Sequence, residues 1–179
     1  QGCLPSDRNM NYLSALSEYC KKNNIILILD EIITGLRTNC SSVQNKYNLH
    51  SDISTFGKAF GNILPIAFIG ISKKIEKKIS KKNIKIFFGG TFSGNSLSMY
   101  VANEFLKFIL RSKKKIFHDL EIKSSKFCNE VNKHINEHDI NAKVIRFGSV
   151  IRLIFTNHDP KNRFQRDFFE KKNTSKINQ

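Results

Sequence analysis

Three residues with chemically versatile side chains each follow an apolar segment of this chain. Asp30 ends the run at residues 25–29, Lys58 stands between two glycines in GKAFG, and Thr91 lies in the turn GGTFSGN. In open α/β sheets, ligands gather at the carboxyl ends of the strands. An acid, a lysine and a glycine-rich turn with hydroxyls together match the needs of pyridoxal phosphate: a Schiff-base amine, a carboxylate for the pyridinium nitrogen, and donors for the phosphate. The apolar neighbours of Lys58 also predict a desolvated amine, whose neutral form is the nucleophile.

Each of these features also has a purely structural interpretation. A strand-terminal acid such as Asp30 can simply cap the turn that follows, and a glycine-flanked lysine is commonly a solvated loop residue. The turn GGTFSGN also lacks the Gly and Lys spacing of a nucleotide P-loop. The three features in this order, rather than any one of them, indicate a cofactor site.

The elements that would position these residues alternate between helix and strand. The first helix is predicted from Ser6 or Asp7, either of which can cap it, to a basic close at residues 21–24. The apolar runs after it predict four strands, of which the first and third are expected to be buried, at residues 25–29, 52–56, 66–71 and 84–88. A basic helix with an apolar stripe is expected at residues 73–82. This alternation predicts an α/β architecture with a mostly parallel sheet.

The second half of the chain changes from helical to strand-like periodicity. From Ser96 a helical stripe comprises Leu97, Tyr100, Val101, Phe105, Phe108 and Ile109, and a break is expected at the lysines 113–115. A second helix is predicted near residues 118–137, a strand pair at 144–147 and 150–155, and a last helix at 163–171. We therefore expect two parts: an α/β domain over residues 1–112, then a linker helix and an α+β domain over residues 113–179.

The charge of the chain is strongly positive, at +15 from 30 basic and 15 acidic residues. Such a balance can indicate a nucleic-acid partner. Most of the basic residues are lysines scattered among Asn and Ile, and aromatic residues do not interleave with them as stacking platforms would require. The composition therefore argues against a nucleic-acid partner, although a basic binding module stays open as an alternative.

Sequence patterns for membranes, secretion, disulfides and metals are weak in this chain. No apolar window of about 18 residues predicts a membrane span, and the first residues show no secretory signal pattern. The four cysteines have neither CxxC spacing nor the density of a disulfide scaffold, so free thiols are expected. We expect a cytoplasmic protein with no membrane partner and no metal site.

Three segments resemble the class III pyridoxal-phosphate aminotransferases, and within them most closely the glutamate-1-semialdehyde 2,1-aminomutase group. LILDEIITGLR resembles the acid-bearing strand, STFGKAFGNILPIAFIG the Schiff-base lysine segment, and GGTFSGNSLSM the phosphate-contacting turn. The intervals of 28 residues from Asp30 to Lys58 and 33 from Lys58 to Thr91 agree with the family spacing. The resemblance implies a fold-type I PLP-dependent transferase: a partial large domain followed by the start of an α+β C-terminal domain.

The resemblance also implies a role for each matching residue. Lys58 would be catalytic, as the lysine that forms the Schiff base (the internal aldimine) with pyridoxal 5'-phosphate, and Asp30 would pair with the pyridine nitrogen. Ile32 would lie against the ring, where the family usually has Val. Gly90 and Thr91 would contact the cofactor phosphate of a neighbouring subunit, which implies a homodimer with shared active sites.

The implied function is amino-group transfer on a small-molecule amino donor or acceptor, within glutamate-1-semialdehyde or in a related class III reaction. Ile33 favours the aminomutase group, because many other class III enzymes have Gln there. Two departures are Gly61-Asn62-Ile63, where the family has a run of glycines, and Ser96, where it has Pro. The match also omits the family's own-subunit phosphate loop and ring-stacking aromatic. We therefore expect a fragment that is inactive alone, and an inactive remnant or a non-catalytic basic binding module are the alternatives.

Overall fold

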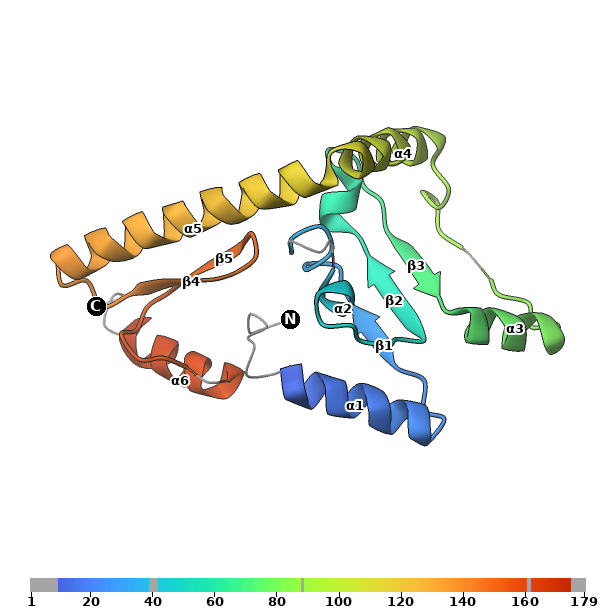
Figure 1. The fold of residues 1–179 in the computed structure, drawn as a ribbon, viewed down its shortest axis with the longest axis horizontal. Helices are drawn as coiled ribbons and strands as arrows, with labels where there is room; N and C mark the ends of the chain where they lie inside the picture. Colours follow the sequence, from blue (N-terminus) through green and yellow to red (C-terminus); the bar gives the residue numbers. More distant parts are fainter. Residues whose placement is uncertain (1–9, 39–41, 88, 161, 175–179) are drawn as a thin grey trace. The chain divides into compact units, whose positions relative to one another are not determined.

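The computed structural model describes residues 10–38, 42–87, 89–160 and 162–174 (Figure 1). The predicted helix caps at Ser6 and Asp7 lie outside these residues. The described chain forms two compact units: the N-terminal unit ends at Phe117, and the C-terminal unit begins at His118. Each unit is described by itself.

The N-terminal unit has four α-helices, a short 3₁₀ helix and three strands among the described residues that lie wholly within it. In chain order they are α1 (Met10–Lys22), β1 (Ile28–Asp30), α2 (Val43–Lys46), β2 (Ile53–Phe56), η2 (Lys58–Gly61), β3 (Phe68–Ile71), α3 (Lys73–Lys81) and α4 (Ser96–Arg111). The long helix α5 (Lys113–Glu137) contains the boundary between the units. The predicted break between the two long helices is confirmed at Ser112, although α5 begins five residues earlier than the helix predicted near 118.

The three strands form one sheet in the order β1-β2-β3. β1 pairs with β2 in parallel, with Asp30 opposite Thr55, and β3 runs antiparallel to β2, with Phe68 opposite Phe56. The ends of β1 and β2 and the start of β3 therefore meet at one edge of the sheet (Figure 1). We call this the carboxyl edge, because it is where the two parallel strands finish.

The core of the N-terminal unit fixes the short helix that follows β2. Phe60 of η2 is buried with Leu36, Ile109 and Phe117. Its ring also lies edge-on to those of Phe56 and Phe68, at centroid distances of 5.3 and 4.9 Å. Aromatic pairs at such distances contribute beyond their buried area. The cluster therefore anchors the chain two residues after Lys58.

The expectation of strands buried on both faces is wrong for this structure. Ile25 and Ile26 are exposed and outside any strand, Ile28 in β1 is 58% exposed, and β3 is mostly exposed. Burial of both faces needs helices or a second sheet on each side. In the described chain β1 has a strand neighbour on one side only. The apolar pattern predicted three of the strands near their observed positions but did not predict what covers them.

Two further expectations differ from the structure. Residues 84–87 form no strand in the described chain, and Phe87 is 91% exposed; the predicted end of that strand, at residue 88, lies outside the described residues. In α4 the buried positions are Ser98, Ala102 and Ile109, whereas Leu97, Tyr100 and Phe108 of the predicted stripe are exposed. The buried face of α4, which lies near η2, therefore combines the small residues Ser98 and Ala102 with Ile109 of the predicted stripe.

The C-terminal unit pairs a helix with a hairpin. β4 (Lys143–Phe147) and β5 (Val150–Ile154) are antiparallel, as predicted, and helix α6 (Arg163–Thr174) follows. Cys128 and Ile135 of α5 are buried with Val144 of β4. The Asn132 side chain accepts a hydrogen bond from Val144 N (2.7 Å) and donates one to its carbonyl oxygen (2.9 Å). The Asn132 side chain therefore makes with the Val144 backbone the two hydrogen bonds that a neighbouring strand would otherwise make.

Candidate active site at the carboxyl edge

Asp30 is held at the carboxyl edge by two hydrogen bonds to one oxygen. Its Oδ1 accepts from Ile32 N (3.0 Å) and from the Thr55 hydroxyl on β2 (3.1 Å). The side chain is exposed. These bonds fix the rotamer of the carboxylate without burying it, so it stays accessible to a ligand.

The neighbouring acid, Glu31, has a structural role that the sequence analysis missed. Its side chain is 2% exposed, and it accepts hydrogen bonds from Val43 N (3.0 Å), Gln44 N (2.8 Å) and the Thr34 hydroxyl. The two amides belong to the first turn of α2, whose N–H groups have no partner within the helix. Glu31 therefore caps α2, and Asp30 is the acid of the pair that faces outward.

Lys58 begins η2 with a backbone conformation that is unusual for lysine. Its φ is +49°. Seven non-glycine residues of the described chain have positive φ, and Asn or Asp occupies all but two of those positions, which are Leu36 and Lys58. The left-handed region costs an ordinary L-residue about 1 kcal/mol or more. Strain of this kind is common at functional positions, and Lys58 shares it with Leu36 of the buried core.

The expectation that apolar neighbours bury Lys58 is wrong, because its side chain is exposed. The backbone before it is nevertheless tightly enclosed. A Cβ placed on Gly57 would lie 3.8 Å from Ile32 Cγ2 and 3.5 Å from the Ile66 carbonyl oxygen. The loop after β1 therefore meets the start of the lysine segment, which brings Ile32 to the position next to Lys58.

The turn that contains Gly90 and Thr91 lines a cavity to which Asp30 and Lys58 do not contribute. Gly90 has a φ of +145°, and its carbonyl oxygen accepts a hydrogen bond from Ser93 N (3.0 Å). The Asn95 side chain caps α4 by accepting a hydrogen bond from Ser98 N (3.0 Å). A cavity of about 560 Å³ lies between residues 90–95, the start of α4 and residues 65–67. The cavity is lined in part by the first residues of α4, and the N–H groups at helix N-termini favour anions.

The structure brings together some of the predicted site residues but not all of them. Asp30, Ile32 and Lys58 share the carboxyl edge. Gly90 and Thr91 line the cavity, whereas Lys58 and Asp30 do not. Ile66 and Ala67 lie between the two groups: both line the cavity, and both would lie within 4 Å of a Cβ placed on Gly57.

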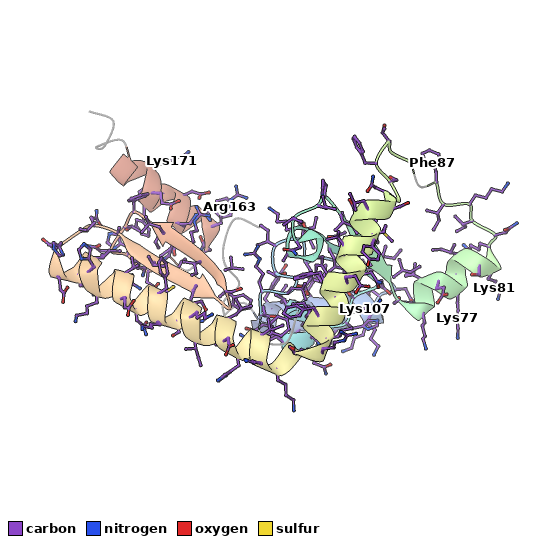
Figure 2. The ribbon with its side chains drawn as sticks, turned by 90° about the horizontal axis from the view of Figure 1, so that it is seen from above. Lys77, Lys81, Phe87, Lys107, Arg163 and Lys171 are labelled. Carbon is purple, nitrogen blue, oxygen red and sulfur yellow. The ribbon has the colours of Figure 1, made fainter. Side chains whose placement is uncertain are left out.

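Basic side chains also gather on α3, away from this site. Lys77 and Lys81 project from that helix, and Phe87 extends from the segment after it (Figure 2). Ile75 is the buried residue of the helix, as its predicted apolar stripe requires. The lysines thus form the solvated face of an amphipathic helix. No helix in the described residues is long and apolar enough to cross a membrane.

Comparison with known proteins identifies the family. Residues 4–175 match the model of the family described as aminotransferase class-III. The chain is 35% identical over 158 residues to a glutamate-1-semialdehyde 2,1-aminomutase from Wigglesworthia glossinidia brevipalpis, covering 88% of this chain and 35% of that protein. It is also 35% identical over 174 residues to the protein of that name from Thermosipho melanesiensis, with coverage of 94% and 37%. The chain thus spans about a third of the length of these curated relatives.

Solved structures share the fold. A glutamate-1-semialdehyde aminomutase from Pseudomonas aeruginosa superposes with a TM-score of 0.74 at 20% identity, covering 93% of this chain and 38% of that one. A β-phenylalanine aminotransferase from Variovorax paradoxus gives a TM-score of 0.76 at 19% identity, with coverage of 92% and 37%. The architecture is therefore that of part of a fold-type I PLP-dependent transferase, as the sequence predicted. This chain belongs to the class III aminotransferase family.

Proposed function

We propose that this chain carries the lysine-bearing part of a pyridoxal-phosphate site in an enzyme that transfers amino groups. The observation that carries the proposal is the parallel pairing of β1 and β2. This pairing places Asp30 opposite Thr55, whose hydroxyl donates a hydrogen bond to the Asp30 carboxylate. Thr55 in turn lies three residues before Lys58 in the sequence. A carboxylate at the end of β1 and an amine just after β2, at one edge of the sheet, form the pair that this cofactor needs.

The residues present suit the chemistry of the cofactor. When bound, pyridoxal phosphate supplies a protonated ring that stabilises negative charge on the carbon next to an amino group. Asp30 would hold the proton at the ring nitrogen, and its rotamer is already fixed by Ile32 N and Thr55. The exposed Lys58 amine would hold the cofactor and move the substrate proton. Ile32, beside Gly57, would lie against the ring and exclude water from one face.

We propose that Gly90 and Thr91 bind the cofactor phosphate of a second copy of the chain. The cavity beside them has the polar turn and helix N-terminus that a phosphate needs, and neither Lys58 nor Asp30 lines it. A dimer with shared sites would supply the missing neighbour. Mixing Lys58→Ala and Thr91→Ala chains tests this, because a mixed dimer regains one intact site. Cofactor attachment that stays at the level of the two separate variants would contradict sharing.

The substrate we propose is glutamate-1-semialdehyde, converted by transfer of its amino group within the molecule. The curated relatives reported above carry the aminomutase name at 35% identity. Ile33 supports the same group, because an apolar side chain stands where many class III relatives have Gln. Because this chain spans about a third of those relatives, we propose that it binds the cofactor weakly and does not turn over substrate by itself.

Attachment of the cofactor to Lys58 tests the proposed role directly. The 179-residue chain is incubated with pyridoxal phosphate and reduced with borohydride, and the modified lysine is located by peptide mass spectrometry. We expect labelling at Lys58 that Lys58→Ala abolishes and that Lys81→Ala, a change on the exposed basic helix, leaves intact. Labelling spread evenly over the surface lysines would contradict the proposal.

The same variants separate a basic binding module from an enzyme part. A binding module would associate with nucleic acid in a salt-dependent way, and Lys58→Ala would leave that association unchanged. Measurable turnover of an amino donor by the isolated chain would instead contradict the proposed inactivity.

A further inference from the structure

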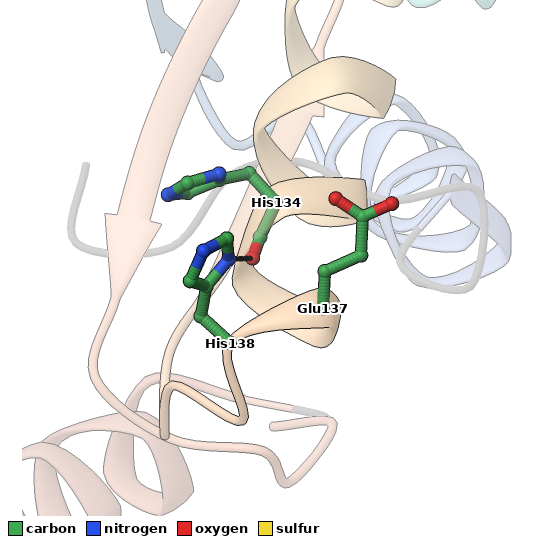
Figure 3. Close-up of side chains that lie close together, drawn as sticks. All are labelled: His134, Glu137 and His138. Carbon is green, nitrogen blue, oxygen red and sulfur yellow. Dashed lines mark hydrogen bonds between the residues drawn. The ribbon is translucent and has the colours of Figure 1, made fainter.

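The last turn of α5 gathers three side chains that can bind a metal ion. They occur in the sequence HINEH, in which His134 lies three residues before Glu137 and four before His138, so each of the two is its neighbour on the helix surface. One ligand atom from each lies within 4.8 Å of the others, and all three residues are exposed. Figure 3 shows the two imidazoles close together on one side of the helix, with the Glu137 carboxylate directed away from them.

The hydrogen bonding of His138 prepares one of its nitrogens for a metal. Its Nδ1 lies 2.9 Å from the His134 carbonyl oxygen. A carbonyl oxygen only accepts, so Nδ1 is the donor, and the neutral ring with this tautomer has its lone pair on Nε2. Histidines that bind metals usually donate their other N–H to a carbonyl or carboxylate in this way. The two rings are already near each other, with centroids 4.0 Å apart.

We propose that His134, Glu137 and His138 form a surface site for a borderline divalent ion, of which Zn²⁺ is the best fit. Two imidazole nitrogens and a carboxylate oxygen are ligands that zinc prefers. Zinc–nitrogen bonds of about 2.0–2.1 Å in a tetrahedron require ligand atoms about 3.3 Å apart. Metal binding would therefore require the three exposed side chains to rotate from their present positions, where one ligand atom of each lies within 4.8 Å of the others. Water would fill the remaining position.

The spacing H-x-x-E-H also occurs in a class of zinc hydrolases, in which the Glu acts as a base. The setting here indicates binding alone. The group lies on an exposed helix end, and no other His, Cys, Asp or Glu of the described chain joins it. Lys133 forms an ion pair with Glu137 at 3.7 Å, but both side chains are more than half exposed, so its competition with the ion is weak.

Zinc titration of the full chain by isothermal calorimetry tests the site. We expect one saturable site whose affinity falls roughly tenfold or more in His134→Gln and in His138→Gln, because each removes one of three ligands. His118→Gln, an exposed histidine on the same helix, is the matched control and should bind zinc like the unmodified chain. If zinc bound to cysteine thiolates instead, its affinity would be unchanged in both histidine variants, and the proposed site would be wrong.

A second measurement identifies the ligands themselves. In NMR spectra of the imidazoles, sub-stoichiometric zinc should shift the resonances of His134 and His138 and leave those of His118 in place. Absence of a saturable site, or equal affinity in His134→Gln and the unmodified chain, would overturn the proposal. Because all the altered residues are exposed, circular dichroism should show unchanged helix content in each variant.

Discussion

The adjacent acids Asp30 and Glu31 should respond to mutation in opposite ways. Glu31 is buried and accepts from two backbone amides, whereas Asp30 is exposed and faces the carboxyl edge. We predict that Glu31→Ala destabilises the fold and that Asp30→Asn impairs cofactor attachment at Lys58 with little effect on stability.

The magnitude follows from the groups that each change leaves without a partner. Glu31→Ala removes the acceptor for Val43 N and Gln44 N, and an unsatisfied buried donor costs about 1–3 kcal/mol. The Thr34 hydroxyl can rotate toward another acceptor, and Gln44 N is only partly buried, so neither should add the full cost of an unsatisfied group. We therefore expect the free energy of unfolding to fall by about 3 kcal/mol. Asp30→Asn keeps an oxygen that can accept from Ile32 and Thr55, so its cost should stay below about 1 kcal/mol.

Urea unfolding of the two variants measures the difference in stability. Amide hydrogen exchange provides the local measurement, because a loss of about 3 kcal/mol corresponds to exchange about a hundredfold faster at Val43 and Gln44. Borohydride labelling of Lys58 then provides the functional measurement. If Glu31→Ala unfolds within about 0.5 kcal/mol of the unmodified chain, the capping role is refuted; undiminished labelling in Asp30→Asn would refute the cofactor role.

Three other predictions concern packing and protonation. Asn132→Ala should lower the free energy of unfolding by about 2 kcal/mol, because it leaves both backbone groups of Val144 without their side-chain partner; urea unfolding measures this. Gly35→Ala should cost about 1–3 kcal/mol by the same assay, since the new Cβ would lie 2.7 Å from a ring carbon of Phe60. Burial raises the pKa of the Cys128 thiol, so alkylation of the folded chain should be slow until the pH exceeds the usual thiol range. Stability should fall over the same alkaline range, because unfolding lets that thiol ionise at a lower pH.

The residues proposed for the site come from sequence patterns, whereas their surroundings became known only from the structure. Asp30 and Lys58 were found by type and spacing, and parallel pairing of their strands follows from the helix–strand alternation. The burial of β1 and β3 was mispredicted, because an apolar run shows what a segment can pack against and not whether a partner is present. The outward-facing Leu97 and Tyr100 on α4 illustrate the same limit, since the small residues Ser98 and Ala102 occupy the packed face.

The histidine pair can be found from local sequence spacing, whereas the capping role of Glu31 cannot. HINEH lies at the end of a helix that was predicted, so the shared face of His134 and His138 follows from helical spacing alone. The role of Glu31 depends on amides twelve and thirteen residues later, which no local pattern connects to it. Long-range partners of this kind require the structure.

The backbone at Lys58 suggests how the site is kept in place. A positive φ at a lysine costs about 1 kcal/mol or more, and burial of a Phe side chain stabilises by about 2–3 kcal/mol. Phe60 supplies that burial two residues later, in the core with Phe56 and Phe68 close by. The aromatic anchor can therefore offset the strain, and it fixes where the lysine leaves the sheet edge. The residues of the GKAFG segment therefore act together: buried Phe60 anchors the segment, and this anchor positions Lys58 near the end of β1, where Asp30 and Ile32 lie.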